Sequence, residues 1–406
     1  MLVIVPFLAY VTWILLSSTN VGADCTIFIN YPQGDLKEPQ PLILRENNSY
    51  KSFLYPENND GILRIRAGAT IVLACPGKNN YLKNEVWGEK AEAVCLRNKL
   101  FHVNGGTYDF SSLICAKNAV DSTKYMKPPH YACKHTSVEI GFYMGNTFIP
   151  TIEICRDDRT YATYYTKFRM TRHIDSFQKG YPRPRFKQGK FYQGISVDNL
   201  YQFDTQNETL TKILGSSELL RGRLRKSVQY LARGHLAAKA DFVYGSQQNG
   251  TFWFLNVMPQ WQSFNGGNWK FLENSIRDVA KNRQLELDVY TGVYGQMTMA
   301  DINSIQQPIY LYPERRILPV PKYFWKIVYD PLLKKGTAFV GLNDPFVESI
   351  ADIKSLYLCT DVTKQIKWLN WSPNNITAGF SYACSVNELR RKVSEIPNFH
   401  VTGLLK

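Results

Sequence analysis

The pattern of apolar and polar residues changes along this chain. Between residue 24 and about residue 137, short runs of β-forming residues are cut by Gly, Asn and Pro, as in CTIFIN and GILRIRAGATIVLAC. Runs of this kind bounded by turn residues are typical of β-strands. From about Ser137, SVEIGFYMGNTFIPTIEIC predicts two more strands, and clustered aromatic residues follow. We therefore expect a small β-rich domain over residues 24–137 and a larger domain over residues 138–406.

A strand, a loop and a helix are predicted in the middle of the larger domain. TFWFLNV has the composition of a strand that ends at Asn256, and FNGGN, which contains Asn265, has that of a turn. NWKFLENSIRDVAKN predicts an amphipathic helix. Glu273 and Arg277 are four residues apart in it, so they should share one face. Beside them lies the apolar stripe expected to be buried: Trp269, Leu272, Ile276 and Val279.

The first 23 residues indicate the compartment. LVIVPFLAYVTWILL is too short to span a bilayer comfortably, and SSTNVGA places the small residues Val21 and Ala23 at a cleavage site. A signal anchor is the alternative, which Pro6 and the cleavage site disfavour. No later segment is apolar enough to cross a membrane. We expect a signal peptide at residues 1–23 and a secreted, extracellular chain that begins near Asp24 and has no membrane contact.

The cysteine count agrees with secretion. An even number, eight, after a signal peptide implies disulfides. Cys359 and Cys384 stand apart from the rest and are expected to pair, whereas the sequence does not choose among the pairings of the other six. HYACKH resembles a metal cluster, but in an oxidising compartment Cys133 is expected to be a half-cystine. The sequons that fit secretion are at Asn47, Asn207, Asn249 and Asn375, with a weaker one at Asn370.

The charge is strongly basic, with 48 Lys and Arg against 34 Asp and Glu and a formal net charge of +14. Such a balance indicates a polyanionic partner, either nucleic acid, an anionic lipid surface or a sulfated glycan, but charge alone indicates a soluble basic protein without such a partner equally well. Two stretches concentrate the cations, and aromatic residues interleave with the first. Cations follow a phosphate backbone and aromatic faces stack on bases, whereas a solvated loop is the alternative. The candidate nucleic-acid-binding residues are Arg183, Arg185, Lys187, Arg221, Arg223 and Arg225.

Both basic stretches precede LARGHLAAKADF, which contains Arg233 and His235. The few His and Cys residues nearby exclude a soft-metal site, and no G-x-S-x-G motif supports a serine hydrolase. Mg²⁺ takes oxygen ligands and needs only one or two from the protein, so the Asn265 oxygen can serve while Glu273 holds a metal-bound water. A neutral His can accept a proton from water, and guanidinium groups can hold a phosphate. This set of residues is suited to phosphodiester hydrolysis.

From about Ser137 to its C-terminus, the chain resembles the DNA/RNA non-specific endonuclease family, and most closely its secreted invertebrate branch of gut and saliva. The family signature is Asp-Arg-Gly-His, a strand that ends in Asn, an Asn nine residues on, a Glu eight further and an Arg four further. NVMPQ and FNGGNWKFLE also match the flanking pattern. The residues that stand at those spacings here are Arg233, Gly234, His235, Asn256, Asn265, Glu273 and Arg277.

The resemblance implies an α+β fold. It implies a ββα-metal nuclease domain with an antiparallel sheet and flanking helices, here preceded by the small disulfide-rich β domain. It also implies a secreted, Mg²⁺-dependent endonuclease, with Mn²⁺ as a possible substitute, that hydrolyses phosphodiester bonds in both DNA and RNA.

The same resemblance implies a role for each site residue. Gly234 would let the phosphate approach the backbone closely. The other implied roles are His235 as general base, Asn265 as the direct Mg²⁺ ligand, Glu273 as the residue that orients the metal's waters, Arg233 and Arg277 as phosphate contacts, and Asn256 as a residue that fixes the site geometry. An arginine further upstream in the family matches Arg183 or Arg185.

The chain departs from the family pattern at Ala232, where the bacterial members have Asp. Alanine accepts no hydrogen bond, so a second hypothesis stays open: a secreted, salivary, high-affinity nucleic-acid-binding protein on the same scaffold with weak residual activity. Binding of heparin-like glycans by the basic stretches is a third. The sequence does not indicate a preference for DNA or RNA, single or double strands, or an oligomeric state.

Overall fold

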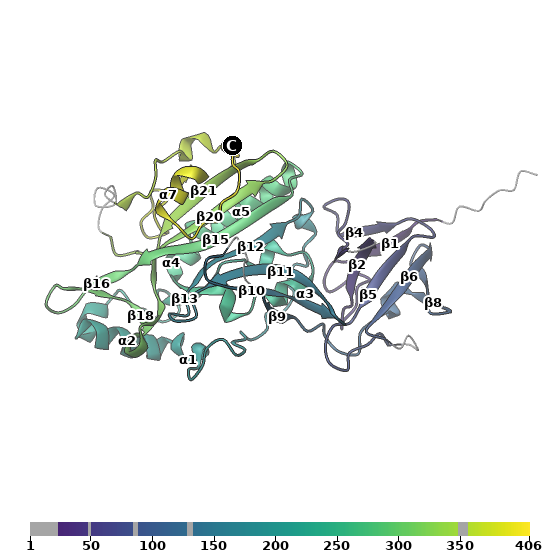
Figure 1. Ribbon diagram of the computed structural model, residues 1–406, viewed down its shortest axis with the longest axis horizontal. Coiled ribbons are helices and arrows are strands. Elements are labelled where there is room, and N and C mark those ends of the chain that lie inside the picture. Colours follow the sequence, from purple (N-terminus) through teal and green to yellow (C-terminus); the bar gives the residue numbers. More distant parts are fainter. Residues whose placement is uncertain (1–22, 48–49, 84–87, 128–132, 348–355) are drawn as a thin grey trace, which may run out of the picture.

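The computed structural model describes residues 23–47, 50–83, 88–127, 133–347 and 356–406. These residues form two β-sheet units that lie side by side, with the N-terminal unit at one end of an elongated molecule (Figure 1). The predicted signal peptide falls outside the described residues except for its last position. In the part of the chain that the structure describes, no helix is both long enough and apolar enough to cross a membrane.

The N-terminal unit is all β, as the short apolar runs predict. A six-stranded antiparallel sheet has the order β3-β2-β5-β6-β7-β8, and β1 pairs with β4 beside it. Two disulfides cross-link this unit: Cys25–Cys95 joins β1 to β6, and Cys75–Cys115 joins the end of β5 to the segment after β8. The strands are β1 Cys25–Phe28, β2 Leu42–Asn47, β3 Tyr50–Phe53, β4 Ile62–Ile65, β5 Thr70–Ala74, β6 Lys90–Arg97, β7 Leu100–Val103 and β8 Gly106–Asp109.

The second unit is built on an eight-stranded antiparallel sheet of order β22-β21-β20-β15-β12-β11-β10-β9. This sheet begins with β9, which lies before the predicted domain boundary at residues 137–138. The Cys133–Cys155 disulfide also crosses that boundary. The hairpin predicted from SVEIGFYMGNTFIPTIEIC is confirmed as β10 and β11. The strands are β9 Ser122–Tyr125, β10 Thr136–Met144, β11 Thr147–Arg156, β12 Thr163–Met170, β15 Leu287–Gln296, β20 Pro321–Asp330, β21 Lys335–Leu342 and β22 Ser381–Ser385.

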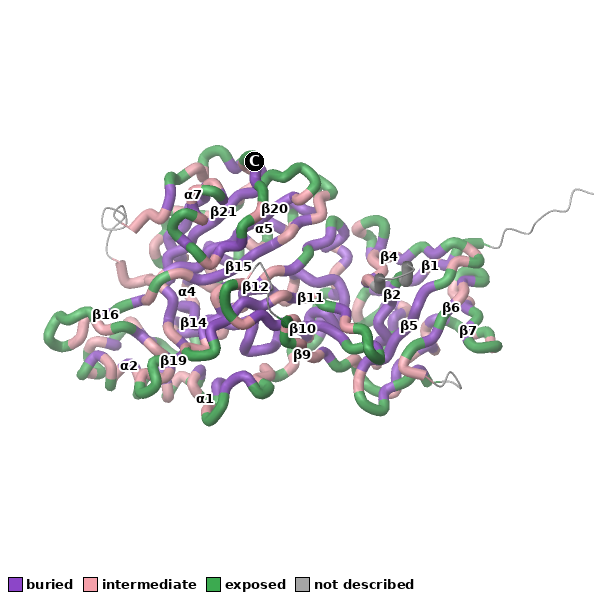
Figure 2. Tube along the Cα trace, viewed as in Figure 1, coloured by how far each residue is buried: buried purple, intermediate pink, exposed green. Residues whose placement is uncertain are grey.

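Strand β20 shows why this sheet is covered on both faces. Its sequence PKYFWKIVYD is mostly apolar, and nine of its ten residues are buried, which is typical of a strand covered on both faces. On one face, Phe324 packs against Trp269 of helix α5, with ring centroids 5.7 Å apart. On the other face, Trp325 belongs to a second core that includes Val386 and Leu389 of helix α7. The core therefore lies in two layers, one on each side of the sheet. Figure 2 shows that strands of this sheet, such as β15 and β20, are largely buried.

The predicted strand–loop–helix unit is confirmed in part. Helix α5 spans Asn268–Asn282, as its apolar stripe predicts, and all four stripe residues are buried. The strand predicted to end at Asn256 is wrong: Phe254–Asn256 forms a 3-10 turn, and β14 begins at Val257. The hydrogen bonds of the buried Asn256 side chain fix this turn. The FNGGN turn is also partly helical, since α4 spans Gln262–Asn265.

The remaining elements surround this unit. Strands β13 Leu231–His235 and β14 Val257–Trp261 form an antiparallel pair that lies against the large sheet. The predicted Cys359–Cys384 disulfide is confirmed and joins the C-terminal segment to β22. The other elements are α1 Val197–Leu200, α2 Phe203–Leu214, α3 Gly245–Gly250, β16 Thr298–Ala300, β17 Gln306–Pro308, β18 Tyr310–Tyr312, β19 Ile317–Pro319 and α7 Val386–Lys392.

Candidate active site

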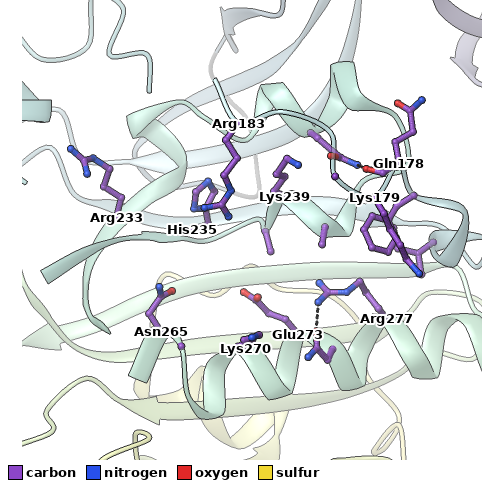
Figure 3. A pocket seen from close by; sticks show the side chains of 18 of the residues that line it. Gln178, Lys179, Arg183, Arg233, His235, Lys239, Asn265, Lys270, Glu273 and Arg277 are labelled. Carbon is purple, nitrogen blue, oxygen red and sulfur yellow. Dashed lines mark hydrogen bonds between the residues drawn. The ribbon is translucent and has the colours of Figure 1, made fainter. Parts of the chain in front are cut away.

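A cleft of about 1010 Å³ opens between strand β13 and helix α5. Figure 3 shows side chains from both walls that point into it. Cationic side chains outnumber acidic ones along the cleft, which favours an anionic ligand. The cations are Lys179, Arg183, Arg233, Lys239, Lys270, Arg277 and Lys281, and the acids are Asp175, Glu273 and Asp278.

His235 stands at the end of β13 with one ring nitrogen free. The ring is hydrogen-bonded to the backbone of Arg233, and Nε2 is buried without a hydrogen-bond partner in the described structure. Burial, and then the positive charge of Arg183, lower the pKa of His235 to about 4. The imidazole is therefore neutral at physiological pH, and its Nε2 can accept a proton.

Arg183 lies next to His235, as Figure 3 shows. Its guanidinium stands 5.8 Å from the ring centroid of Phe252, a ring that also packs against His235 at 5.1 Å. Arg183 makes no ion pair with any carboxylate of the described residues, so its charge is available to a phosphate. Of the two candidates for the upstream arginine, Arg183 lines the cleft and Arg185 does not.

Asn265 and Glu273 face His235 from the opposite wall (Figure 3). Asn265 stands at the end of α4, and its Nδ2 points to Gln262 Oε1 at 3.4 Å, which leaves its own Oδ1 for another partner. Glu273 stands one turn into α5. An amide oxygen and a carboxylate are the ligands that Mg²⁺ takes from a protein, so the residues present fit a magnesium site with few protein ligands.

Buried charges surround Glu273. Burial raises the pKa of its carboxyl to about 7, Lys326 and Arg277 oppose this rise, and Asp241 adds to it. Lys326 comes from β20 in the sheet below and is fully buried. Its Nζ lies 3.3 Å from the carbonyl oxygen of Leu236, the residue after His235. Lys326 thus bonds to the backbone just after the strand that carries His235, and its charge also favours the ionised form of Glu273.

The two predicted phosphate arginines are both ion-paired. Arg277 binds the buried Asp241 through Nη1 at 2.5 Å and Asn274 through Nη2. Arg233 binds Asp198 at 2.7 Å, and Figure 3 shows its side chain pointing away from the middle of the cleft. Arg277 therefore presents a partly neutralised guanidinium to the cleft, and Arg233 would have to leave Asp198 to reach a phosphate there.

Asn256 and Gly234 have structural explanations. The buried side chain of Asn256 accepts a hydrogen bond from Ala237 N at 2.8 Å and donates to the carbonyl oxygens of Ala237 and Thr251. It thereby fixes the turn that follows β13. At Gly234, a Cβ atom would lie 2.5 Å from Gln260 Oε1. Close packing against β14 accounts for this glycine, whereas the sequence suggested approach of a phosphate.

Gln260 also faces Ala232, the position at which this chain departs from the family pattern. Ala232 and Gln260 are direct partners in the β13–β14 ladder. Gln260 is fully buried, and neither Oε1 nor Nε2 of its side chain has a hydrogen-bond partner among the described residues. A carboxylate at position 232 would stand beside this unpaired amide, because opposed residues share one face of the ladder.

Most of the predicted nucleic-acid-binding residues lie outside the cleft. Lys187 is ion-paired with the buried Asp121, so it belongs to the packing of the fold. Arg223 stands over Phe346 at 5.5 Å. The exposed residues, which could extend a binding surface beyond the cleft, are Arg185, Arg221 and Arg225.

Sequence reasoning missed several residues of the cleft. Lys239 follows His235 within the same motif, and Lys270 stands on the helix face that carries Glu273. Asp241, also in the motif, lies buried behind the cleft and pairs with Arg277. Lys326 carries a signal of its own, since a lysine in the middle of the apolar run YFWKIVY is unusual. That signal indicates a buried polar role but does not identify its partners, because they come from distant parts of the chain.

Comparison with known proteins agrees with this geometry. The family model described as DNA/RNA non-specific endonuclease matches residues 134–389. The chain is 25% identical to "Salivary endonuclease" of Lutzomyia longipalpis over 369 residues, which cover 90% of this chain and 82% of that protein. It is 24% identical to "Salivary protein Tsal1" of Glossina morsitans morsitans over 97% of both chains.

A solved structure titled "Crystal structure of the EndoG/EndoGI complex: Mechanism of EndoG inhibition" also matches. The sequence identity is 16% and the TM-score 0.39, over 63% of this chain and 87% of that one.

Proposed function

The chain belongs to the DNA/RNA non-specific endonuclease family, and from that premise we propose that it hydrolyses phosphodiester bonds of DNA and RNA with Mg²⁺ in the cleft between β13 and α5. The observation that carries the proposal is the free Nε2 of a neutral His235, which faces Asn265 and Glu273 across a cleft lined mainly by cations. A base, oxygen ligands and phosphate-binding groups thus meet at one place.

In this proposal His235 is the general base. Its Nε2 takes a proton from the attacking water while the water oxygen bonds to phosphorus and the 3′-oxygen leaves. The hydrogen bond to the Arg233 backbone holds the ring with Nε2 free. Arg183, which has no carboxylate partner among the described residues, binds the scissile phosphate and offsets the charge that develops on it. Arg277, held by Asp241, supplies a second positive group on the opposite wall.

Asn265 and Glu273 are the residues that would hold the cation. Lewis-acid stabilisation of the phosphoryl oxygen and of the leaving 3′-oxygen is the chemistry that Mg²⁺ supplies when bound, and Mn²⁺ could substitute for it. Glu273 must be ionised to take part. Lys326 favours that ionised form from below.

We also infer that the protein is secreted. Four disulfides stabilise the fold, and such bonds persist in oxidising compartments. Two similar proteins are named as salivary. A signal peptide at residues 1–23, an N-terminal domain at 24–137 and a nuclease domain at 138–406 belong to the same proposal.

A nucleic-acid-binding protein with weak residual activity is the second candidate function. Ala232 favours it, because this position offers no carboxylate to the unpaired amide of Gln260. The intact His235, Asn265 and Glu273 favour the enzyme. If the wild-type protein binds DNA and RNA tightly but does not cut them, Ala232→Asp is the direct test of whether that one carboxylate is limiting.

The experiment that tests the proposal incubates the purified mature protein with plasmid DNA and with RNA. Cleavage of both is expected in Mg²⁺, and excess EDTA should stop it at once, because a site with so few protein ligands holds Mg²⁺ weakly. Cleavage that persists in excess EDTA would rule out the proposed metal role. Binding without cleavage in Mg²⁺ would support the second candidate.

A further inference from the structure

The segment that brings Arg183 to the cleft has little structure of its own. Within residues 178–187, here called the arginine segment, residues 181–186 form neither strand nor helix. Pro182 and Pro184 lack the amide hydrogen needed for local hydrogen bonds, and a residue that precedes a proline is restricted to extended conformations. The arginine segment is therefore stiff locally, but its place above the cleft must be set by contacts outside it.

The N-terminal β-unit holds the beginning of the arginine segment. The buried side chain of Gln178 donates from Nε2 to the carbonyl oxygen of Ile29 at 2.7 Å. The ring of Tyr31 packs edge-on against Tyr181, with centroids 4.9 Å apart. The Glu38 carboxylate accepts a hydrogen bond from the same Tyr181. Three contacts from residues 29–38 thus converge on the chain just before Arg183.

The connection between the two β-units holds the other end. Asp121 is buried between β8 and β9 and accepts hydrogen bonds from Lys187 Nζ and, at 2.5 Å, from Trp253 Nε1. The backbone of Lys187 bonds to Phe252 O at 2.8 Å and to Phe254 N at 2.9 Å. The arginine segment is therefore anchored four residues after Arg183 as well as before it.

Between the two anchors, Arg183 extends over the cleft. Its guanidinium lies over Phe252, and its positive charge lowers the pKa of His235. Lys239 Nζ donates to the carbonyl oxygen of Tyr181 at 2.5 Å. None of the N-terminal anchor residues, Ile29, Tyr31 and Glu38, lines the cleft. They touch the residues that carry Arg183 and do not approach the chemistry itself.

We propose that the N-terminal β-unit is a positioning device for the nuclease reaction: it holds the arginine segment so that Arg183 stands beside His235 at the scissile phosphate. This inference rests on the proposed function. Tyr31, Glu38 and Asp121 are positioning residues, and Arg183 is the group through which they act.

A second set of contacts between the two units provides a matched control. Tyr55 packs against Tyr244, with ring centroids 5.9 Å apart, and its hydroxyl oxygen accepts a hydrogen bond from Gln247 at 2.8 Å. Neither contact is made to residues 178–187, although Gly245 of the same helix α3 donates to Gln178 Oε1 at 2.6 Å. Tyr55→Ala should therefore weaken the interface between the units without moving Arg183.

The test is a double-mutant cycle on the full mature protein with duplex DNA and Mg²⁺. Arg183→Ala should lower kcat/KM by about a hundredfold, and Tyr31→Ala combined with Glu38→Ala by about threefold to tenfold. In the Arg183→Ala background the same pair should change kcat/KM by less than about twofold, since the group they position is gone. Tyr55→Ala should lower the melting temperature but leave kcat/KM unchanged. Tyr181→Phe, which deletes only the hydroxyl that binds Glu38, serves as a milder variant if the pair fails to fold.

Three results would overturn the inference. These are a loss of kcat/KM for the Tyr31 and Glu38 pair that is equal with and without Arg183, a fall in melting temperature for that pair with no change in kcat/KM, and an unchanged rate for Arg183→Ala. An unchanged rate for Arg183→Ala would also remove that residue from the proposed phosphate site, whereas the proposed hydrolysis itself is tested separately, by cleavage in Mg²⁺ and by His235→Ala. Conversely, full hydrolysis by His235→Ala would reject the proposed base whatever the cycle shows.

Discussion

Two titratable groups face each other with their usual order of acidity reversed. A histidine ordinarily holds its proton to higher pH than a glutamate, yet here the pKa of His235 falls to about 4 and that of Glu273 rises to about 7. Burial is the main cause of both shifts, since it disfavours the charged form of each group. Near neutral pH the imidazole of His235 is therefore uncharged, and the Glu273 carboxyl is close to its pKa.

The first prediction follows from the Glu273 carboxyl. Its raised pKa means that it is increasingly protonated as the pH falls through about 7, so the cation must then displace a proton to bind. At low Mg²⁺ concentration, kcat/KM should fall below about pH 7, and saturating Mg²⁺ should move this fall to lower pH. His235 stays neutral until about pH 4 and does not contribute to this limb.

The measurement is the pH profile of kcat/KM at two Mg²⁺ concentrations for the wild type and for Glu273→Gln. The variant should be slower and should lose the Mg²⁺-dependent limb, because it carries no titrating carboxyl. An acid limb in the wild type that does not move with Mg²⁺ would assign the titration to another group.

At this scale the sequence predicts residue types and spacing but not partners. His235, Asn265 and Glu273 meet at one cleft, as the motif suggests. The environment of Lys187 could not be foreseen, because a charge run does not reveal that one of its members faces a buried aspartate such as Asp121. The reason for Gly234 was also missed, since the side chain it accommodates belongs to a neighbouring strand.

Among the elements, helix α5 was predictable to its ends and strand β14 was not. The stripe of α5 repeats at helical spacing, and burial of that stripe decides the structure. TFWFLNV is rich in β-forming residues, but the side chain of Asn256 bonds to distant backbone at Ala237 and turns the chain before the strand begins. Tertiary hydrogen bonds thus override local propensity there.

The second prediction concerns the contact between β20 and the site. Lys326→Met removes a buried cation that favours ionised Glu273 and a donor to the Leu236 carbonyl. Activity at fixed Mg²⁺ should fall about tenfold to a hundredfold, the range found for residues that support metal ligands. The melting temperature should also fall, because removing one partner from a group of buried charges deprives Glu273 and Asp241 of a compensating cation, so activity is compared well below that temperature.

The control is Lys335→Met, which removes an exposed cation at the start of β21 in the same sheet. It should leave activity at the wild-type level. Unchanged activity in Lys326→Met, or an equal loss in both variants, would show that the buried charge does not support the site.

The protein carries a net charge of +14, and some of the cations that line the cleft are not neutralised by a carboxylate. Four cleft cations have no carboxylate partner among the described residues, namely Lys179, Arg183, Lys239 and Lys270, while others in the cleft are paired. The division into a β-rich N-terminal part and a larger second part is predicted by the change in the pattern of apolar and turn residues near residue 137. The contacts between the parts are not, because they join residues more than a hundred positions apart, such as Ile29 and Gln178.

The third prediction uses salt to separate binding cations from structural ones. Each phosphate contact contributes about 0.9 to the slope of log affinity against log salt for duplex DNA. Arg183→Ala with Arg185→Ala should therefore reduce the slope by about one to two. Lys187→Ala should leave the slope unchanged and lower the free energy of unfolding by about 1–3 kcal/mol, because Asp121 loses a partner.

Affinities measured by fluorescence anisotropy across a salt series, in EDTA to prevent cleavage, give these slopes. A lower slope for Lys187→Ala would mean either that its ion pair opens to bind nucleic acid or that loss of this anchor moves Arg183 away from the phosphate. An unchanged slope for the arginine pair would place that surface in solvent.

The most direct test of the central claim compares His235→Ala with the wild type in matched preparations, so that trace nuclease cannot mask a loss. Hydrolysis of DNA and RNA in saturating Mg²⁺ should fall by roughly a hundredfold to ten-thousandfold, the usual contribution of a general base. Binding of both nucleic acids in EDTA should remain near the wild-type level, because the cations of the cleft are intact. A variant that cuts as fast as the wild type would contradict the assignment of the active site to His235.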